Sequence, residues 1–205
     1  LQAFEMTGKA QWLERASGLR ALALRHFFDE GSGTIAEFLA PDLSPLAGEP
    51  GARREVGHQC EWAWLLRREM ALGGREDLSD IVSRLEGFAL KHGFTTSGVM
   101  RGAAFDAVSA DGGLLEETFL LWPQTEAIKM HAVRHMAGAT DAGNAAMELM
   151  VLMFERYFRD RRVFVNQLDA AGRAIWPEAL SRLLYHIVLA LTEGARAGLW
   201  PGPTR

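Results

Sequence analysis

A repeated pattern of amphipathic helices is the feature that most constrains the fold of this chain. Apolar residues recur at three-to-four spacing over residues 9–28, which predicts a helix there. His58, Trp122 and His186 stand 64 residues apart, each near the start of another such segment. A repeat of this length fits two helices and a connection, so we expect about three helical hairpins. The further predicted helices are 58–72, 76–92, 122–138, 141–159 and 181–197.

The connections between these helices have a different pattern, which predicts short β-hairpins. Residues 105–115 and 165–175 align at an offset of 60, with the bends "ADGG" and "AAGR" between short apolar stretches. A similar turn is expected within residues 33–46. We therefore predict an all-α fold with short β-hairpin-like connections. In a ring of such hairpins, the inner helices direct their first turns at one common mouth.

Composition excludes several classes of function. The chain carries 22 Lys and Arg against 26 Asp and Glu, without a basic cluster, so nucleic acid is not an expected partner. No stretch approaches the roughly 18 apolar residues of a membrane span. The only cysteine, Cys60, excludes an intramolecular disulfide and favours a cytoplasmic location. The chain begins at Leu1 in what reads as the tail of a helix ended by Thr7 and Gly8, which indicates a fragment or a processed chain.

Two histidines are the strongest candidates for chemistry. His58 and Glu61 are three residues apart, so a helix places them on one face, where Glu61 can hydrogen-bond His58 or a ligand hydroxyl. His186 stands near the start of another inner helix and is followed by an apolar run. A neutral histidine suits proton transfer near physiological pH. The alternative for each of them is a structural histidine that is hydrogen-bonded within the core.

Aromatic and amide side chains accompany these histidines. Trp62 follows His58 on the same helix and Tyr185 precedes His186, while the third helix opening offers Trp122, Gln124 and Glu126. Tryptophan faces suit the apolar faces of pyranose rings, and Gln and Glu can pair with hydroxyl groups. A sugar site is therefore chemically coherent, with Trp62, Trp122, Gln124 and Tyr185 as substrate-binding candidates.

Other combinations of residues favour different sites. His131 and His135 have the i, i+4 spacing of a metal pair, but they lack a third ligand, so we expect a solvated helix face and no metal. Glu61 and Asp106 could serve as the two carboxylates of a glycosidase. The histidines would then have no role, so this interpretation ranks below proton transfer. Cys60 is expected to be packed.

Three motifs, in this order and at these intervals, carry a resemblance to a known family: "EVGHQCEWAWLL" at 55–66, "LLWPQTEAIKM" at 120–130 and "LYHIVLAL" at 184–191. They resemble the second half of the N-acylglucosamine 2-epimerase superfamily, including its mannose isomerase and mannose-6-phosphate isomerase-like members. The resemblance implies an (α/α)6 barrel of twelve helices. Residues 1–205 would then be a single domain, the C-terminal half of that barrel.

The resemblance also implies residue roles. His58 and His186 match the family's acid/base pair, with His186 as the C2 base, and Glu61 matches a carboxylate that supports the first histidine and the sugar. Trp122 matches a wall of the pocket. Such enzymes form a cis-enediolate from a sugar or sugar phosphate and need neither a metal nor a redox cofactor. The implied function is a sugar isomerase or 2-epimerase.

The chain also departs from the family pattern. Val56, Cys60 and Leu121 stand where proline, phenylalanine and arginine are usual. Family members are about twice as long, so a second chain or a homodimer would have to complete the barrel. The alternatives are a non-catalytic or incomplete helical-repeat fragment that needs a partner chain, and a glycosidase of the same barrel type.

Overall fold

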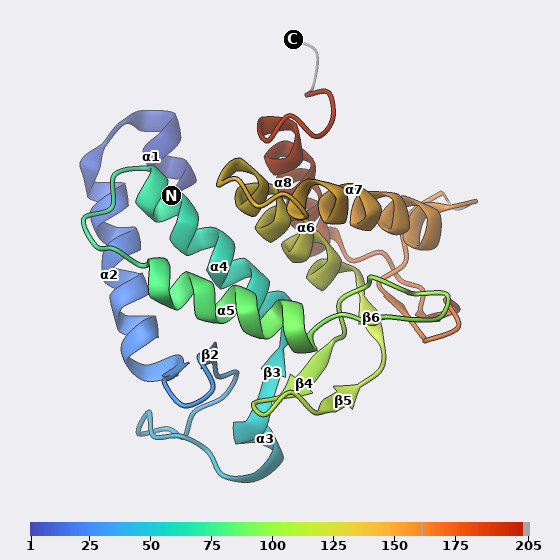
Figure 1. Ribbon diagram of the computed structural model, residues 1–205, viewed down its shortest axis with the longest axis horizontal. Coiled ribbons are helices and arrows are strands. Elements are labelled where there is room, and N and C mark those ends of the chain that lie inside the picture. The colour runs from blue at the N-terminus through green and yellow to red at the C-terminus, as the bar shows by residue number, and fades with distance from the viewer. Residues whose placement is uncertain (161, 203–205) are drawn as a thin grey trace.

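The computed structural model describes residues 1–160 and 162–202, and it is built mainly from helices (Figure 1). The periodic segments of the sequence form these helices with shifts of a few residues at their ends. The α-helices are α1 (Gln2–Thr7), α2 (Ala10–Phe27), α3 (Gly48–Ala52), α4 (Val56–Ala71), α5 (Ser79–His92), α6 (Leu121–Met136), α7 (Ala142–Met153) and α8 (Leu184–Arg196).

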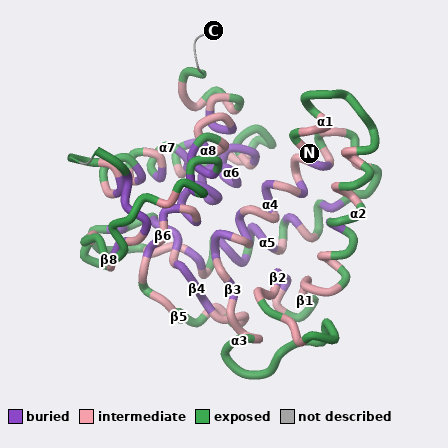
Figure 2. The backbone as a smooth tube through the Cα atoms, turned by 180° about the vertical axis from the view of Figure 1, so that it is seen from behind, coloured by how far each residue is buried: buried purple, intermediate pink, exposed green. Residues whose placement is uncertain are grey.

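Three helices form an inner layer. α4 packs against α6, and α6 packs against α8, while α5 and α7 cover α4 and α6 from outside. Figure 2 shows many buried residues along α4 and α6. On α6, Leu121 and every residue from Pro123 to Val133 are buried, because neighbouring helices enclose it on several sides. The expectation of helical hairpins with alternating inner and outer helices is confirmed.

Two predicted helices end or begin differently from the expectation. The segment 141–159 forms α7 and continues as one π-helical turn, Phe154–Phe158. The segment 181–197 opens with a 3-10 turn, Ser181–Leu183, before α8. Gly8, with φ of 65°, ends α1, as the pattern at the start of the chain predicts.

The β-structure lies where the inner helices begin. β3 leads into α4 and pairs with β4, and β6 leads into α6 and pairs with β7. The hairpins β4–β5 and β7–β8 confirm the turns predicted from the two aligned segments. The strands are β1 (Phe28–Asp29), β2 (Thr34–Ile35), β3 (Arg53–Glu55), β4 (Ala107–Ser109), β5 (Leu114–Glu116), β6 (Phe119–Leu120), β7 (Gln167–Leu168) and β8 (Ala174–Trp176).

The turn predicted within residues 33–46 forms only in the later part of that segment, where an isolated antiparallel bridge joins Leu39 to Pro45. The earlier part, β2, pairs backward with β1 instead. The rest of this connection runs as a loop beside the start of α4. It supplies a side chain to the site described below.

Apolar side chains remain exposed on helices at both edges of the layer. On α8, Leu184 and Val188 are 55% and 57% exposed, and on α2, Leu19 and Leu22 are 69% and 53% exposed. Large apolar side chains gathered on a helix face usually mark a contact surface. Among the described residues, no helix has both the length and the apolar content to cross a membrane.

Candidate active site

A cavity of about 360 Å³ opens at the end of the inner helices where α4, α6 and α8 begin. The lining includes five side chains singled out from the sequence, and these come from three separate helices. The lining residues are Glu55, His58, Glu61, Leu120, Trp122, Asn166, Trp176, Arg182, Leu183, Tyr185 and His186. The predicted common mouth of the inner helices is therefore present.

Trp122 lies between the two histidines. Its ring centroid is 4.7 Å from that of His58 and 6.0 Å from that of His186. The ring fits there because residue 57 is a glycine: a Cβ atom at Gly57 would lie 2.3 Å from Cζ3 of Trp122. The glycine before His58 thus allows α4 and α6 to meet closely. One indole ring forms the wall that both imidazoles share.

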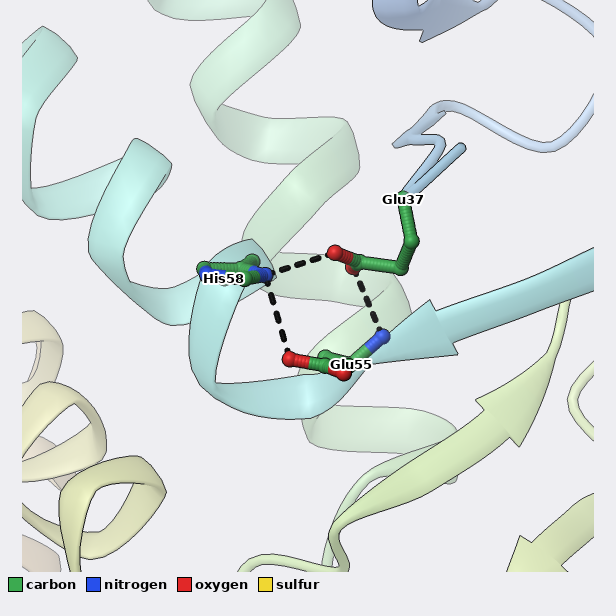
Figure 3. Close-up of side chains that lie close together, drawn as sticks. All are labelled: Glu37, Glu55 and His58. Carbon is green, nitrogen blue, oxygen red and sulfur yellow. Dashed lines mark hydrogen bonds and ion pairs between the residues drawn. The ribbon is translucent and has the colours of Figure 1, made fainter. Parts of the chain in front are cut away.

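Two carboxylates contact the Nδ1 atom of His58 (Figure 3). Its Nδ1 lies 2.6 Å from Oε2 of Glu37 and 3.4 Å from Oε2 of Glu55. Burial disfavours the charged ring, but the hydrogen bond and charge of Glu37, helped by Glu55, outweigh this and raise the pKa of His58. The first histidine is therefore biased toward its protonated form.

His186 has a carboxylate partner of its own. Its Nδ1 lies 2.5 Å from Oε1 of Glu126, which is fully buried on α6. The second oxygen of Glu126 lies 2.5 Å from Nζ of the fully buried Lys129. This contact is an ion pair between two buried side chains. The Lys129 ammonium also lies 3.8 Å from the ring centroid of Trp64, a cation–π contact.

Glu61 lines the cavity, and its negative charge is one of those that raise the pKa of His58. Among the described residues, it makes no side-chain hydrogen bond to that ring, whose Nδ1 is engaged by Glu37. Glu37, from a loop that the helix pattern did not include, is therefore the carboxylate that binds Nδ1, and Glu61 contributes charge without a hydrogen bond to the ring. Burial raises the pKa of Glu61, and the charge of nearby Glu126 adds to this. Glu61 remains available to a ligand.

Gln124, predicted to bind substrate, has a structural role instead. It is fully buried and clamps the connection before α6: its Oε1 accepts from the amide of Ala104 at 2.8 Å, and its Nε2 donates to the carbonyls of Ala104 and Leu120, each at 2.9 Å. Gln59 clamps Ile35 in the same way. The prediction failed because a glutamine near the start of an inner helix can bind the backbone of a neighbouring connection instead of a ligand.

Replacing Gln124 with alanine is expected to lower the free energy of unfolding by about 3 kcal/mol, because it leaves the buried amide and carbonyl of Ala104 without partners. Chemical denaturation measures this directly. The same substitution at Gln11, which is exposed on α2, should change stability by less than about 0.5 kcal/mol. A Gln124 variant of unaltered stability and weakened ligand binding would restore the substrate-binding role.

Trp62 also lies outside the cavity lining. It is half-buried and packs against the apolar core one helical turn beyond His58. Conversely, the cavity contains residues that lie outside the predicted set of catalytic and substrate-binding side chains. Asn166, 2% exposed, has an Nδ2 atom without a hydrogen-bond partner among the described residues, and Trp176 and Arg182 complete that wall. Their segments resemble the family least, so no motif pointed to them.

The carboxylate pair of a glycosidase does not form. Asp106 is 2% exposed and does not line the cavity that contains Glu61. Its carboxylate accepts hydrogen bonds from Thr118, from the amide of Leu120 and from Gln167 at 2.5 to 2.6 Å. Asp106 therefore ties the strand connections together rather than facing a ligand.

Three further side chains considered in the sequence differ in their surroundings. His131 is buried rather than on a solvated helix face, because α4, α7 and α8 pack around α6. Burial lowers its pKa to about 4. His135 is exposed, as expected. Cys60 is fully buried, and burial raises the pKa of its thiol, which agrees with the expected packing role.

Comparison with protein families matches residues 1–190 to the N-acylglucosamine 2-epimerase (GlcNAc 2-epimerase) family. This chain belongs to that family. A family relative, the mannose-6-phosphate isomerase of Rhizobium meliloti (strain 1021), is 29% identical over 196 residues, which are 90% of this chain and 48% of the relative.

Solved structures agree with this family membership. The crystal structure of a D-mannose isomerase superposes with a TM-score of 0.77 at 17% identity, covering 95% of this chain and 52% of that one. Cellobiose 2-epimerase from Spirochaeta thermophila DSM 6192 gives 0.70 at 19% identity, covering 95% and 52%. These relatives are (α/α)6 barrels, so this family member has the fold of about half such a ring. The chain spans about half the length of the relatives that it matches.

Proposed function

We propose that this chain supplies the acid/base half of a sugar isomerase or 2-epimerase that acts on mannose-type or N-acylglucosamine-type sugars. One observation carries the proposal: two histidines, each held at Nδ1 by a buried carboxylate, line one cavity on either side of Trp122. Two positioned imidazoles are the equipment for moving a proton between neighbouring carbons.

The proposed reaction uses both histidines. Once the pyranose ring is open, His186 removes the proton from C2, and the electron pair of that C–H bond forms the C1–C2 double bond of a cis-enediolate. A proton delivered to C2 on the opposite face gives the epimer, and one delivered to C1 gives the ketose. His58, whose pKa is raised by Glu37, is the proton donor in ring opening or reprotonation. Both steps are proton transfers, so they consume no oxidant or reductant.

The cavity lining supports a sugar as substrate. Trp122 offers an apolar face, while Glu61 and the unpartnered amide of Asn166 can pair with hydroxyl groups. Arg182, at the same cavity, has no ion-pair partner among the described residues and could hold a phosphate. The relatives include a mannose-6-phosphate isomerase, a D-mannose isomerase and a cellobiose 2-epimerase. Free mannose and mannose 6-phosphate are therefore the first substrates to test.

A complete site needs a second set of helices. Tyr185 is 54% exposed at the cavity and Val188 is 57% exposed along the same helix. The relatives that match are about twice as long as this chain. We therefore propose that further helices, from a longer chain or a second copy, cover α8 and close the ring around the sugar.

Proton exchange at C2 tests the proposed function. The purified protein, at a measured oligomeric state, is incubated with mannose, mannose 6-phosphate, glucose and N-acetylmannosamine in deuterated water and followed by NMR. Deuterium entering C2 of one sugar is the expected result and names the substrate. A folded protein that binds a sugar without exchange would instead support a non-catalytic helical module. Cleavage of a glycoside that persists after loss of His186 would support a glycosidase.

Glu61→Gln is expected to lower the rate of C2 exchange by about 100-fold with little change in stability, because Glu61 lines the cavity without an intramolecular hydrogen-bond partner among the described residues. The exchange assay and a thermal melt are measured on the same preparation. Glu14→Gln, at an exposed position on α2, is the matched control and should leave both unchanged. A Glu61 variant that unfolds would indicate a structural carboxylate.

A further inference from the structure

We propose that Glu37 is the positioning residue of His58: it binds Nδ1 of the ring, so that Nε2 is the nitrogen that exchanges a proton with the sugar. The proposal rests on the function proposed above and assigns a role to a loop residue outside all three family-like motifs. Glu37 lies in the loop between β2 and α3, 21 residues before the histidine.

The carboxylate of Glu37 is itself firmly held. Its Oε1 accepts a hydrogen bond from the amide of Glu55 at 2.8 Å, and its Oε2 lies 2.6 Å from Nδ1 of His58. The side chain is only 7% exposed. Because both oxygens are engaged and water is largely excluded, this carboxylate cannot rotate without losing a hydrogen bond. It therefore fixes the orientation of the imidazole ring.

The hydrogen bond to Glu37 determines which ring nitrogen of His58 is free to contact a ligand. A carboxylate accepts hydrogen bonds, so Nδ1 carries a proton and donates a hydrogen bond to Glu37. Figure 3 shows the other ring nitrogen on the side away from Glu37 and Glu55. The ring itself lines the cavity, and it lies next to the indole of Trp122 with the two ring planes tilted by 44°. Nε2 is therefore the nitrogen available to a ligand.

The second histidine has the same arrangement. Glu126 lies 2.5 Å from Nδ1 of His186, as Glu37 lies 2.6 Å from Nδ1 of His58. One carboxylate comes from a neighbouring inner helix and the other from a loop, so the likeness lies in geometry and not in sequence position. Two independent elements that bind the same ring atom of the two histidines favour a positioning role over a chance contact.

The charges around His58 support its protonated form. Glu37 faces it from the loop, Glu55 from the end of β3 and Glu61 from its own helix, while Arg53 offsets part of this charge by pairing with Glu55. Burial alone lowers the pKa of the ring, and Glu37 makes the largest opposing contribution, so the pKa is raised above 6.5. Removing the Glu37 charge should bring the pKa down.

Glu37→Gln tests the role, because it keeps the size of the side chain and removes the charge. The His58 titration is followed by NMR of the imidazole Cε1, with the signal assigned from a His58→Gln variant. We expect the pKa to fall by about 1 pH unit relative to the wild type. A donor is active below its pKa, so the alkaline limb of kcat should move to lower pH, and kcat should fall about 100-fold with KM little changed.

The control variant comes from the same connection between β2 and α4. Glu49→Gln, exposed on α3, should leave the titration and kcat unchanged. A wild-type pKa at or below 6.5, or a Glu37→Gln variant with an unchanged titration, would leave Glu37 with a structural role only. The titration needs no turnover, so it decides the role of Glu37 even where no sugar is found to exchange.

A metal ion is the competing explanation for this cluster. Glu37, Glu55 and His58 offer donor atoms within 4.8 Å of one another, which a divalent cation could bridge. Such an ion would take the place of the proton on Nδ1. We expect that treatment with a chelator leaves the His58 titration and the C2 exchange unchanged. Loss of exchange on chelation, restored by Zn²⁺, would overturn the positioning role.

Discussion

Replacing His186 with asparagine is expected to abolish proton exchange at C2, with a loss of about 1,000-fold or more, while the protein remains folded. Asparagine can still donate a hydrogen bond to Glu126 from roughly the position of Nδ1, so the buried carboxylate keeps a partner. It has no group that can accept a proton from carbon, and a positioned general base contributes about 100- to 10,000-fold. C2 deuterium incorporation and a thermal melt measure both quantities.

The asparagine variant is preferable to alanine at this position. Alanine would leave Oε1 of the fully buried Glu126 without its partner, and a stability loss would then obscure the catalytic one. His135→Asn, at an exposed position on α6, is the matched control and should retain exchange. Exchange that persists in the His186→Asn protein would transfer the base role to another side chain of the cavity, with His58 the first to test.

Lys129→Met is expected to lower the free energy of unfolding by about 3 to 5 kcal/mol. Methionine fills a similar volume, but it leaves the Glu126 carboxylate buried without its countercharge, and Trp64 loses its cation–π contact. A buried charge that loses its partner is strongly destabilising because the surrounding protein solvates it poorly. Denaturant titration at constant pH measures the change.

Two further variants separate charge from packing. Lys91→Met, at an exposed position on α5, should change stability by less than about 0.5 kcal/mol. The double variant Lys129→Met/Glu126→Gln removes both charges and should regain part of the lost stability, because no unpaired charge remains. Equal loss in the single and double variants would show that packing of the lysine stem, and not the ion pair, carries the effect.

The helical architecture was predictable from periodicity. Apolar spacing located the helix at 9–28 and those that follow, because a helix buried on one side needs an apolar residue every three or four positions. The hairpins after the second and third outer segments were predictable from their glycine-containing bends. The connection at 33–46 was predictable only in its later part, because β2 pairs with β1, which precedes it and has no strand-like pattern of its own.

The site was predictable only in part. His58 and His186 could be found because they recur near the starts of inner helices, and the structure brings them to one cavity with Trp122 between them. Gln124 was misassigned because a polar residue in such a motif can face either a ligand or its own backbone. Glu126 belongs to the same motif, but only its contact with His186 in the structure indicates its role.

Local spacing and long motifs were enough to locate the helices and two of the three turns and to indicate the family. The pairing of each histidine with its carboxylate became visible only in the folded chain. Glu37 reaches His58 from a loop, and Glu126 reaches His186 from another helix. The physical reason is that a hydrogen bond depends on distance and direction in space, and no periodicity along the chain records that a loop folds back on a helix.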